Sequence, residues 1–150
     1  QEAYYAKGMG NYYAKNYDAA KTALVWLIKS TTSARSAEAR FSLADIFFQQ
    51  NHLEDADKEV TGILKQKPAY NYWIAKGLIL RSRIYIKQDK LFESEQNLKS
   101  VLEHYKIEDD GILDEANELW NELMQLKEQP KSITPEPNHI IEINDENGGN

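Results

Sequence analysis

The side chains best suited to chemistry in this sequence are histidines and carboxylates, and their spacing does not form a reactive site. The three histidines share no local acidic or histidine partner at the spacing of a metal site; they are His52, His104 and His139. An acidic stretch from Asp109 to Glu115 has the composition of a cation-binding loop, but it lacks the alternating ligand spacing of a calcium loop. We therefore expect no metal ion.

Other catalytic patterns are missing from the sequence as well. The chain has no cysteine, which excludes a thiol nucleophile, disulfides and cysteine-based zinc sites. It has no glycine-rich phosphate loop and no serine-centred nucleophile motif. A run of carboxylates between Glu54 and Glu59 lies at the start of a predicted helix, where it would offset the positive end of the helix dipole. We expect a non-catalytic protein without a cofactor.

Charge is distributed unevenly along the 150 residues, whose net charge is −6. Residues 1–70 carry 9 basic and 8 acidic side chains, residues 71–110 carry 7 and 7, and residues 111–150 carry 2 and 9. The first two regions are nearly neutral, whereas nucleic-acid binding needs a concentrated basic face. No apolar run approaches the length of about 18 residues needed to span a membrane. We expect neither nucleic-acid binding nor direct membrane insertion.

A short pattern occurs three times and predicts paired helices. It is found at Asn16–Ala20, His52–Ala56 and Lys90–Ser94, with spacings of 36 and 38 residues. A period of this size is typical of stacked helical units. Apolar residues recur at helical spacing on both sides of each copy and predict three helix pairs, at about 3–14 with 17–29, 36–50 with 53–66, and 71–88 with 91–105.

The last forty residues divide into a helix and a tail. A predicted helix at about 112–128 has one apolar stripe and one acidic face, as expected for a helix that caps the end of a stack. Asp109-Asp110-Gly111 precedes it and can cap its free N–H groups. Three prolines follow within eight residues, so we expect residues 130–150 to form a disordered acidic tail. The folded domain would cover residues 1–129.

Small residues recur at two positions of each predicted pair, and their pattern resembles the tetratricopeptide repeat (TPR), a helix–turn–helix unit. The equivalent positions are Gly8, Ala44 and Ser82 in the first helices, and Ala20, Ala56 and Ser94 in the second. The matching repeats cover about 1–34, 37–70 and 75–108. The resemblance implies an all-α fold, an α-α superhelix or solenoid of three pairs with a capping helix. Two departures are Arg40, where the family has an aromatic residue, and Arg81, where it prefers leucine.

The resemblance also implies a binding groove lined by the first helix of each pair. Carried over by position, it assigns to the groove Tyr5, Met9, Tyr12, Tyr13, Phe41, Asp45, Gln49, Lys76, Ile79, Arg83 and Lys87. Such a groove would be aromatic at one end and basic at the other. We expect it to bind an extended peptide or a helix, with an acidic group of that partner near Lys76, Arg83 and Lys87.

The function that follows is a non-catalytic scaffold for protein–protein interaction. A structural C-terminal cap of a longer repeat array, with no ligand of its own, is the alternative, and nucleic-acid binding by the groove aromatics is a weaker one. The Tyr-rich, irregular repeats and the acidic cap favour a bacterial cell-envelope or periplasmic protein over a cytoplasmic one. Because Tyr4, Tyr5 and Tyr12 would be partly bare at the first helix, we also expect end-to-end self-association.

Overall fold

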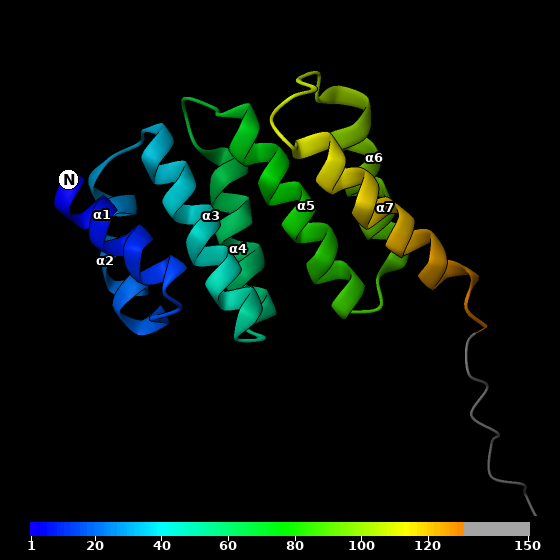
Figure 1. Ribbon diagram of the computed structural model, residues 1–150, viewed down its shortest axis with the longest axis horizontal. Coiled ribbons are helices and arrows are strands. Elements are labelled where there is room, and N and C mark those ends of the chain that lie inside the picture. The colour runs from blue at the N-terminus through cyan, green and yellow to red at the C-terminus, as the bar shows by residue number, and fades with distance from the viewer. Residues whose placement is uncertain (131–150) are drawn as a thin grey trace, which may run out of the picture.

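The computed structural model describes residues 1–130, and all regular secondary structure in this part of the chain is helical (Figure 1). Seven helices follow one another, namely α1 (Glu2–Tyr13), α2 (Tyr17–Ser30), α3 (Ala34–Gln49), α4 (Leu53–Lys65), α5 (Asn71–Lys87), α6 (Leu91–His104) and α7 (Ile112–Glu128). The prediction of an all-α protein is confirmed, and each helix lies within two residues of its predicted bounds. The predicted tail lies outside the described residues, apart from Pro130.

The helices pack in succession and form two layers, as an α-α repeat requires. Each helix contacts the next one along the chain, and α1, α3, α5 and α7 also contact one another in that order. In Figure 1 these four helices lie side by side in front, with α2, α4 and α6 behind them. We call the outer surface of the front layer the first-helix face, because three of its helices are the first of a pair.

The turns inside the three pairs repeat the same backbone conformation. Lys15, Asn51 and Asp89 have φ values of 60°, 59° and 57°, and they are spaced by 36 and 38 residues like the sequence pattern. The residue after each of them donates its N–H to a carbonyl five residues earlier, at 2.8 Å in all three turns. This bond belongs to the Schellman motif, which ends a helix by pairing its last carbonyls. The repeat is therefore a structural period as well as a sequence period.

Small side chains lie where the two helices of each pair cross. Ala20, Ala44 and Ala56 are fully buried. At Gly8 a Cβ atom would lie 2.9 Å from Leu24 Cδ2, so the close approach of α1 to α2 requires glycine or a shift of Leu24. In the third pair the buried Ser82 and Ser94 hydroxyls each donate to the other residue's carbonyl, at 3.2 and 2.9 Å. Close packing thus occurs at the positions that the sequence pattern indicated.

The two arginines that depart from the family pattern both hold α4. Arg40 Nη1 on α3 lies 3.2 Å from Glu59 Oε2, and burial raises the pKa of the Glu59 carboxyl despite this pairing. Arg81 on α5 donates from Nε to Asp57 Oδ1 at 2.6 Å and from Nη2 to Thr61 Oγ1 at 2.7 Å. The carboxylates of α4 that we assigned to the helix dipole therefore also tie α4 to both neighbouring first helices.

The predicted apolar stripe of α7 packs against the third helix pair. Ile112, Ala116, Leu119 and Leu123 are buried against residues of α5 and α6, including Ile79 and Leu98. At its start Gly111 adopts a left-handed conformation with φ of 86°, and Asp110 Oδ1 accepts the N–H of Ile112 at 3.1 Å. This carboxylate caps one of the free N–H groups of the first turn, which fits the predicted start of the helix.

Candidate functional site

Three hollows with shared walls run along the first-helix face and define the candidate site. Their volumes are about 260, 230 and 260 Å³. The first two share Tyr12 and Tyr13, and the last two share Phe41 and Lys76. Asp45 lines the first and the third. Because neighbouring hollows have walls in common, the face carries one groove that extends from α1 across α3 to α5 and α7.

Most of the residues predicted for the groove do line it. The structure brings together Met9, Tyr12, Tyr13, Phe41, Asp45, Gln49, Lys76 and Arg83. Tyr5 and Lys87 lie on the same helices but outside the three hollows. Tyr13 is open to solvent, with 73% of its surface exposed. The aromatic end and the basic end are both present, although their side chains already have partners.

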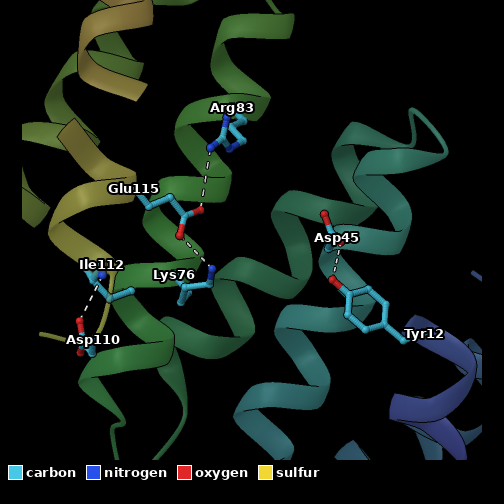
Figure 2. A network of polar contacts seen from close by, with 7 residues as sticks. All are labelled: Tyr12, Asp45, Lys76, Arg83, Asp110, Ile112 and Glu115. Atoms are coloured by element: carbon cyan, nitrogen blue, oxygen red, sulfur yellow. Dashed lines mark hydrogen bonds and ion pairs between the residues drawn. The ribbon is translucent and has the colours of Figure 1, made fainter. Parts of the chain in front are cut away.

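In the N-terminal half of the first-helix face, two tyrosines of α1 are bound to carboxylates of α3. The Tyr5 hydroxyl donates to Glu38 Oε2 at 2.7 Å. The Tyr12 hydroxyl donates to Asp45 Oδ2 at 2.6 Å (Figure 2). The Glu38 hydrogen bond is the main reason that the pKa of Tyr5 rises to about 12. The pKa of Tyr12 is raised further, first by burial and then by the bond to Asp45. Both hydroxyls therefore stay protonated donors at neutral pH.

In the C-terminal half, the basic side chains meet a carboxylate of the capping helix. Lys76 Nζ lies 2.9 Å from Glu115 Oε2, and Arg83 Nη2 lies 3.9 Å from Glu115 Oε1 (Figure 2). Lys76 Nζ also lies 5.1 Å from the ring centroid of Phe41, which is within the range of a cation–π contact. The structure thus places an internal acidic group where we expected the acidic group of a partner.

One predicted groove residue, Ile79, needs correction, and another, Met9, is less accessible than the prediction implies. Ile79 is fully buried and packs with Leu98 and Ala116, so the prediction that it faces a ligand is wrong. The family position falls at a point where α5 is covered by α6 and α7. Met9 lies at the floor of the groove, 7% exposed, with its sulfur 3.5 Å from the Ser42 hydroxyl. It shapes the groove, but a ligand can reach little of its side chain.

The predicted set leaves out several residues that line the groove, and three of them supply its aromatic wall or its ion pair, namely Tyr72, Trp73 and Glu115. Tyr72 and Trp73 line it from the first turn of α5, and their rings meet edge to face with centroids 4.8 Å apart. They were missed because the third repeat was counted from residue 75. Their aromatic character at the start of a predicted helix was the available signal. Glu115 was assigned to the outer face of α7, and no sequence signal distinguishes it from Asp114, Glu118 and Glu122, which are exposed.

The chemistry that this arrangement supports is binding. The groove offers aromatic faces, two anchored carboxylates, a basic pair and the exposed amide of Gln49. Within residues 1–130 no three histidine, aspartate or glutamate side chains converge to hold a metal ion. Of the histidines, His52 lies near the Phe47 ring, with ring centroids 6.4 Å apart. The Nδ1 atom of His104 lies 2.9 Å from the Ser100 carbonyl oxygen.

Comparison of the chain with protein-family models, with curated proteins and with solved structures finds no match in any of the three. In the part of the chain that the structure describes, no helix has the length and apolar character to cross a membrane.

Proposed function

We propose that this chain is a tetratricopeptide-like repeat module whose first-helix face binds an extended peptide or a helix of a partner protein. The repeat assignment is supported by the equal turns at Lys15, Asn51 and Asp89 and by the small residues buried at each helix crossing. It is also supported by the stacking order, in which each first helix contacts the next. The module has no catalytic role in this proposal.

The observation that carries the binding function is the continuous groove on this face. A peptide in an extended conformation can cross several helices and place successive side chains in successive hollows. Tyr13, Tyr72 and Trp73 supply large aromatic surfaces with polar edges, which are enriched at binding sites. Gln49 supplies amide donors and an acceptor. Among these side chains, the loss of Tyr13 or Gln49 would cost the fold little, since both are exposed.

The contacts inside the groove favour a second candidate, a structural unit of a longer repeat array. Tyr5 and Tyr12 bind carboxylates on α3, and Lys76 binds a carboxylate on α7, so part of the polar character of the first-helix face serves to join the helices. A face whose polar groups are already paired offers less to a ligand. In this candidate the groove holds no peptide.

Selection from a displayed library of random peptides separates the two functions. Peptides enriched on the whole chain are then titrated against a Tyr13→Ala, Gln49→Ala double variant. Phe92→Ala is the matched control, because Phe92 is 68% exposed and lies on α6, away from the groove. Circular dichroism and unfolding curves check that all three proteins keep the same fold.

The proposed binding function predicts that the double variant loses at least about tenfold in affinity, or 1.4 kcal/mol, while Phe92→Ala binds like the unchanged chain. Equal affinity of all three proteins would move the site away from the groove. A library that yields no saturable binder would favour the structural unit.

Self-association through the N-terminal end stays a prediction. At that end the Tyr4 and Trp26 rings stack with their centroids 3.8 Å apart, and both remain more than a third exposed. Light scattering over a range of concentrations, with Trp26→Ala as the variant, tests it. A monomer at every concentration would contradict it.

A further inference from the structure

The three helix pairs differ at one equivalent place, the space between the N-terminal half of the first helix and the C-terminal half of the second. In the first pair this space is filled by two aromatic rings. Tyr4 on α1 and Trp26 on α2 stack with ring planes 16° apart. The spacings of 36 and 38 residues make Arg40 and Gly62 the equivalents of Tyr4 and Trp26 in the second pair, and Leu78 and Ser100 the equivalents in the third.

In the second pair an arginine fills the same space. The Arg40 side chain lies across Gly62 so closely that a Cβ atom there would be 2.7 Å from Arg40 Nη1. Polar side chains join α4 to the start of α3 beside this space. Gln66 donates to the Ser33 carbonyl at 3.0 Å and accepts from the Ser36 hydroxyl at 3.3 Å. Two of the three pairs therefore fill this position with their own side chains.

In the third pair the same position is open. Leu78 and Ser100 are smaller than a stacked tyrosine and tryptophan, and they line a cavity of about 360 Å³. The equivalents of the residues that close the second pair are Asn71, Ile74 and His104, which line the cavity as well. Nδ1 of His104 lies 2.9 Å from the Ser100 carbonyl of its own helix, so the imidazole does not bridge to α5 as Gln66 bridges to α3.

The cavity is separate from the candidate groove, and the lining residues that can carry charge at its rim are basic. None of its lining residues lines a hollow of the first-helix face. Its walls are mainly the apolar side chains of α5 and α6, and its rim holds Lys106 and His104 with no carboxylate among the lining residues. The volume is within the range of small-molecule sites, at about 300–1,000 Å³.

We propose that this cavity binds a small aromatic acid, with the planar ring between α5 and α6 and the carboxylate at Lys106. The ring takes the place that Trp26 takes in the first pair. The Lys106 ammonium, which donates to the Glu103 carbonyl at 2.7 Å, has further N–H groups for a carboxylate. The basic rim selects against an aromatic cation, and the slot between the two helices selects for a flat ring.

Titration of the whole chain with indoleacetate, followed by the backbone amide signals of the labelled protein, tests the site. We expect saturable shifts at residues 71–78 and 100–107. Tryptamine carries the same ring with the opposite charge, and cyclohexylacetate carries the same charge without a flat ring. Both are expected to bind at least about tenfold more weakly than indoleacetate.

Two variants at one position make the test specific. Ser100→Trp fills the cavity from within, as Trp26 does in the first pair, and should abolish the shifts. Ser100→Ala keeps the cavity open and should bind like the unchanged chain. If Ser100→Trp does not fold, Leu78→Trp serves the same purpose.

Three results would overturn the proposal. They are the absence of saturable shifts, equal binding of the three probes, or unchanged indoleacetate binding by a folded cavity-filling variant. None of these results bears on the peptide groove, because the two sites share no residue.

Discussion

The two halves of the first-helix face are held together by different kinds of interaction. In the N-terminal half, neutral tyrosine hydroxyls of α1 donate to the carboxylates of α3, and the partners of both bonds are 33 residues apart. In the C-terminal half, two cations of α5 share one carboxylate of α7. Figure 2 shows the Tyr12–Asp45 bond and the contacts of Lys76 and Arg83 with Glu115 in one view. The first needs a protonated hydroxyl, and the second needs opposite charges and the capping helix.

The difference shows how the same face can be built from unlike sequences. Neighbouring helices of the face can be joined by a hydroxyl–carboxylate pair, as between α1 and α3, or by an ion pair, as between α5 and α7. The two links respond to different conditions. Exposed ion pairs weaken with salt, whereas hydrogen bonds from a neutral donor depend on the pKa of that donor. Solution conditions can therefore break one half and leave the other intact.

The largest effect should come from loosening the capping helix, because the C-terminal link depends on it. Leu119→Ala removes a fully buried side chain from the cluster of α5, α6 and α7. We expect the free energy of unfolding to fall by about 2–5 kcal/mol. Denaturant unfolding gives the magnitude, and amide hydrogen exchange gives the location. Exchange should rise in α7 and in the part of α5 near Lys76 far more than in α1.

The matched control for this change is Leu126→Ala on the same helix, since Leu126 is 37% exposed. The free energy of unfolding should fall by less than about 1 kcal/mol, because the side chain of Leu126 is already partly exposed and its truncation removes less buried apolar surface. A uniform rise of exchange across all seven helices after Leu119→Ala would mean that the two halves unfold as one unit.

The fold could be predicted from the sequence because its signals are local and repeated. Helix periodicity, the small residues at crossings and the polar breaks each act within a few residues, and the period carries them along the chain. Arg40 and Arg81 could be recognised as departures from the pattern, but their roles could not. Their partners Glu59 and Asp57 lie on α4, and only the packing of α4 against α3 and α5 brings them together.

The groove was less predictable because its residues depend on the rotation of each helix. A family position fixes a residue number, and a small change in helix rotation moves Ile79 from the surface to the core. The role of Glu115 depends on how α7 packs against α5, about forty residues earlier in the chain. Its carboxylate has the same sequence signature as its solvated neighbours. Contacts between elements of this kind follow from tertiary packing.

The hydrogen bonds between α1 and α3, which form the N-terminal link of the face, are tested by removing one hydroxyl. Tyr12→Phe keeps the ring and leaves Asp45 without its bond at 2.6 Å. We expect the free energy of unfolding to fall by about 1–2 kcal/mol, because a carboxylate that is partly buried loses a donor. Tyr13→Phe is the control on the next residue, whose side chain is largely exposed, and it should change stability by less than about 0.5 kcal/mol. Equal effects at both positions would show that the bond to Asp45 adds nothing.

Alkaline pH should weaken the N-terminal link specifically. The pKa of Tyr5 is raised from 10.0 to about 12 by the bond to Glu38. A group whose pKa is raised on folding contributes stability that is complete below the unfolded value and lost as pH rises through the folded value. The contribution of Tyr5 should therefore be lost between about pH 10 and 12.

Unfolding curves of the chain and of Tyr5→Phe, measured across that range, should converge as pH rises. Tyr12→Phe, whose partner is Asp45, should follow the same trend at still higher pH, since burial raises the pKa of Tyr12 further. A difference between Tyr5→Phe and the unchanged chain that stays constant with pH would contradict the assignment of the Glu38 bond as the cause.

The smallest effect is expected at the C-terminal link, and its salt dependence is what identifies it. Glu115→Gln keeps the shape of the side chain and removes the charge that Lys76 and Arg83 share. The three side chains are partly open to water, so the loss should be about 0.5–1 kcal/mol at low salt and should become smaller at about 1 M salt. The loss from Tyr12→Phe should change little over the same range, because its donor is neutral.

Glu115→Gln also frees Lys76 and Arg83 for an incoming acidic peptide. If the groove binds such a peptide, Glu115→Gln should raise its affinity while lowering stability, and a loss of both would show that Glu115 positions the basic pair for the ligand.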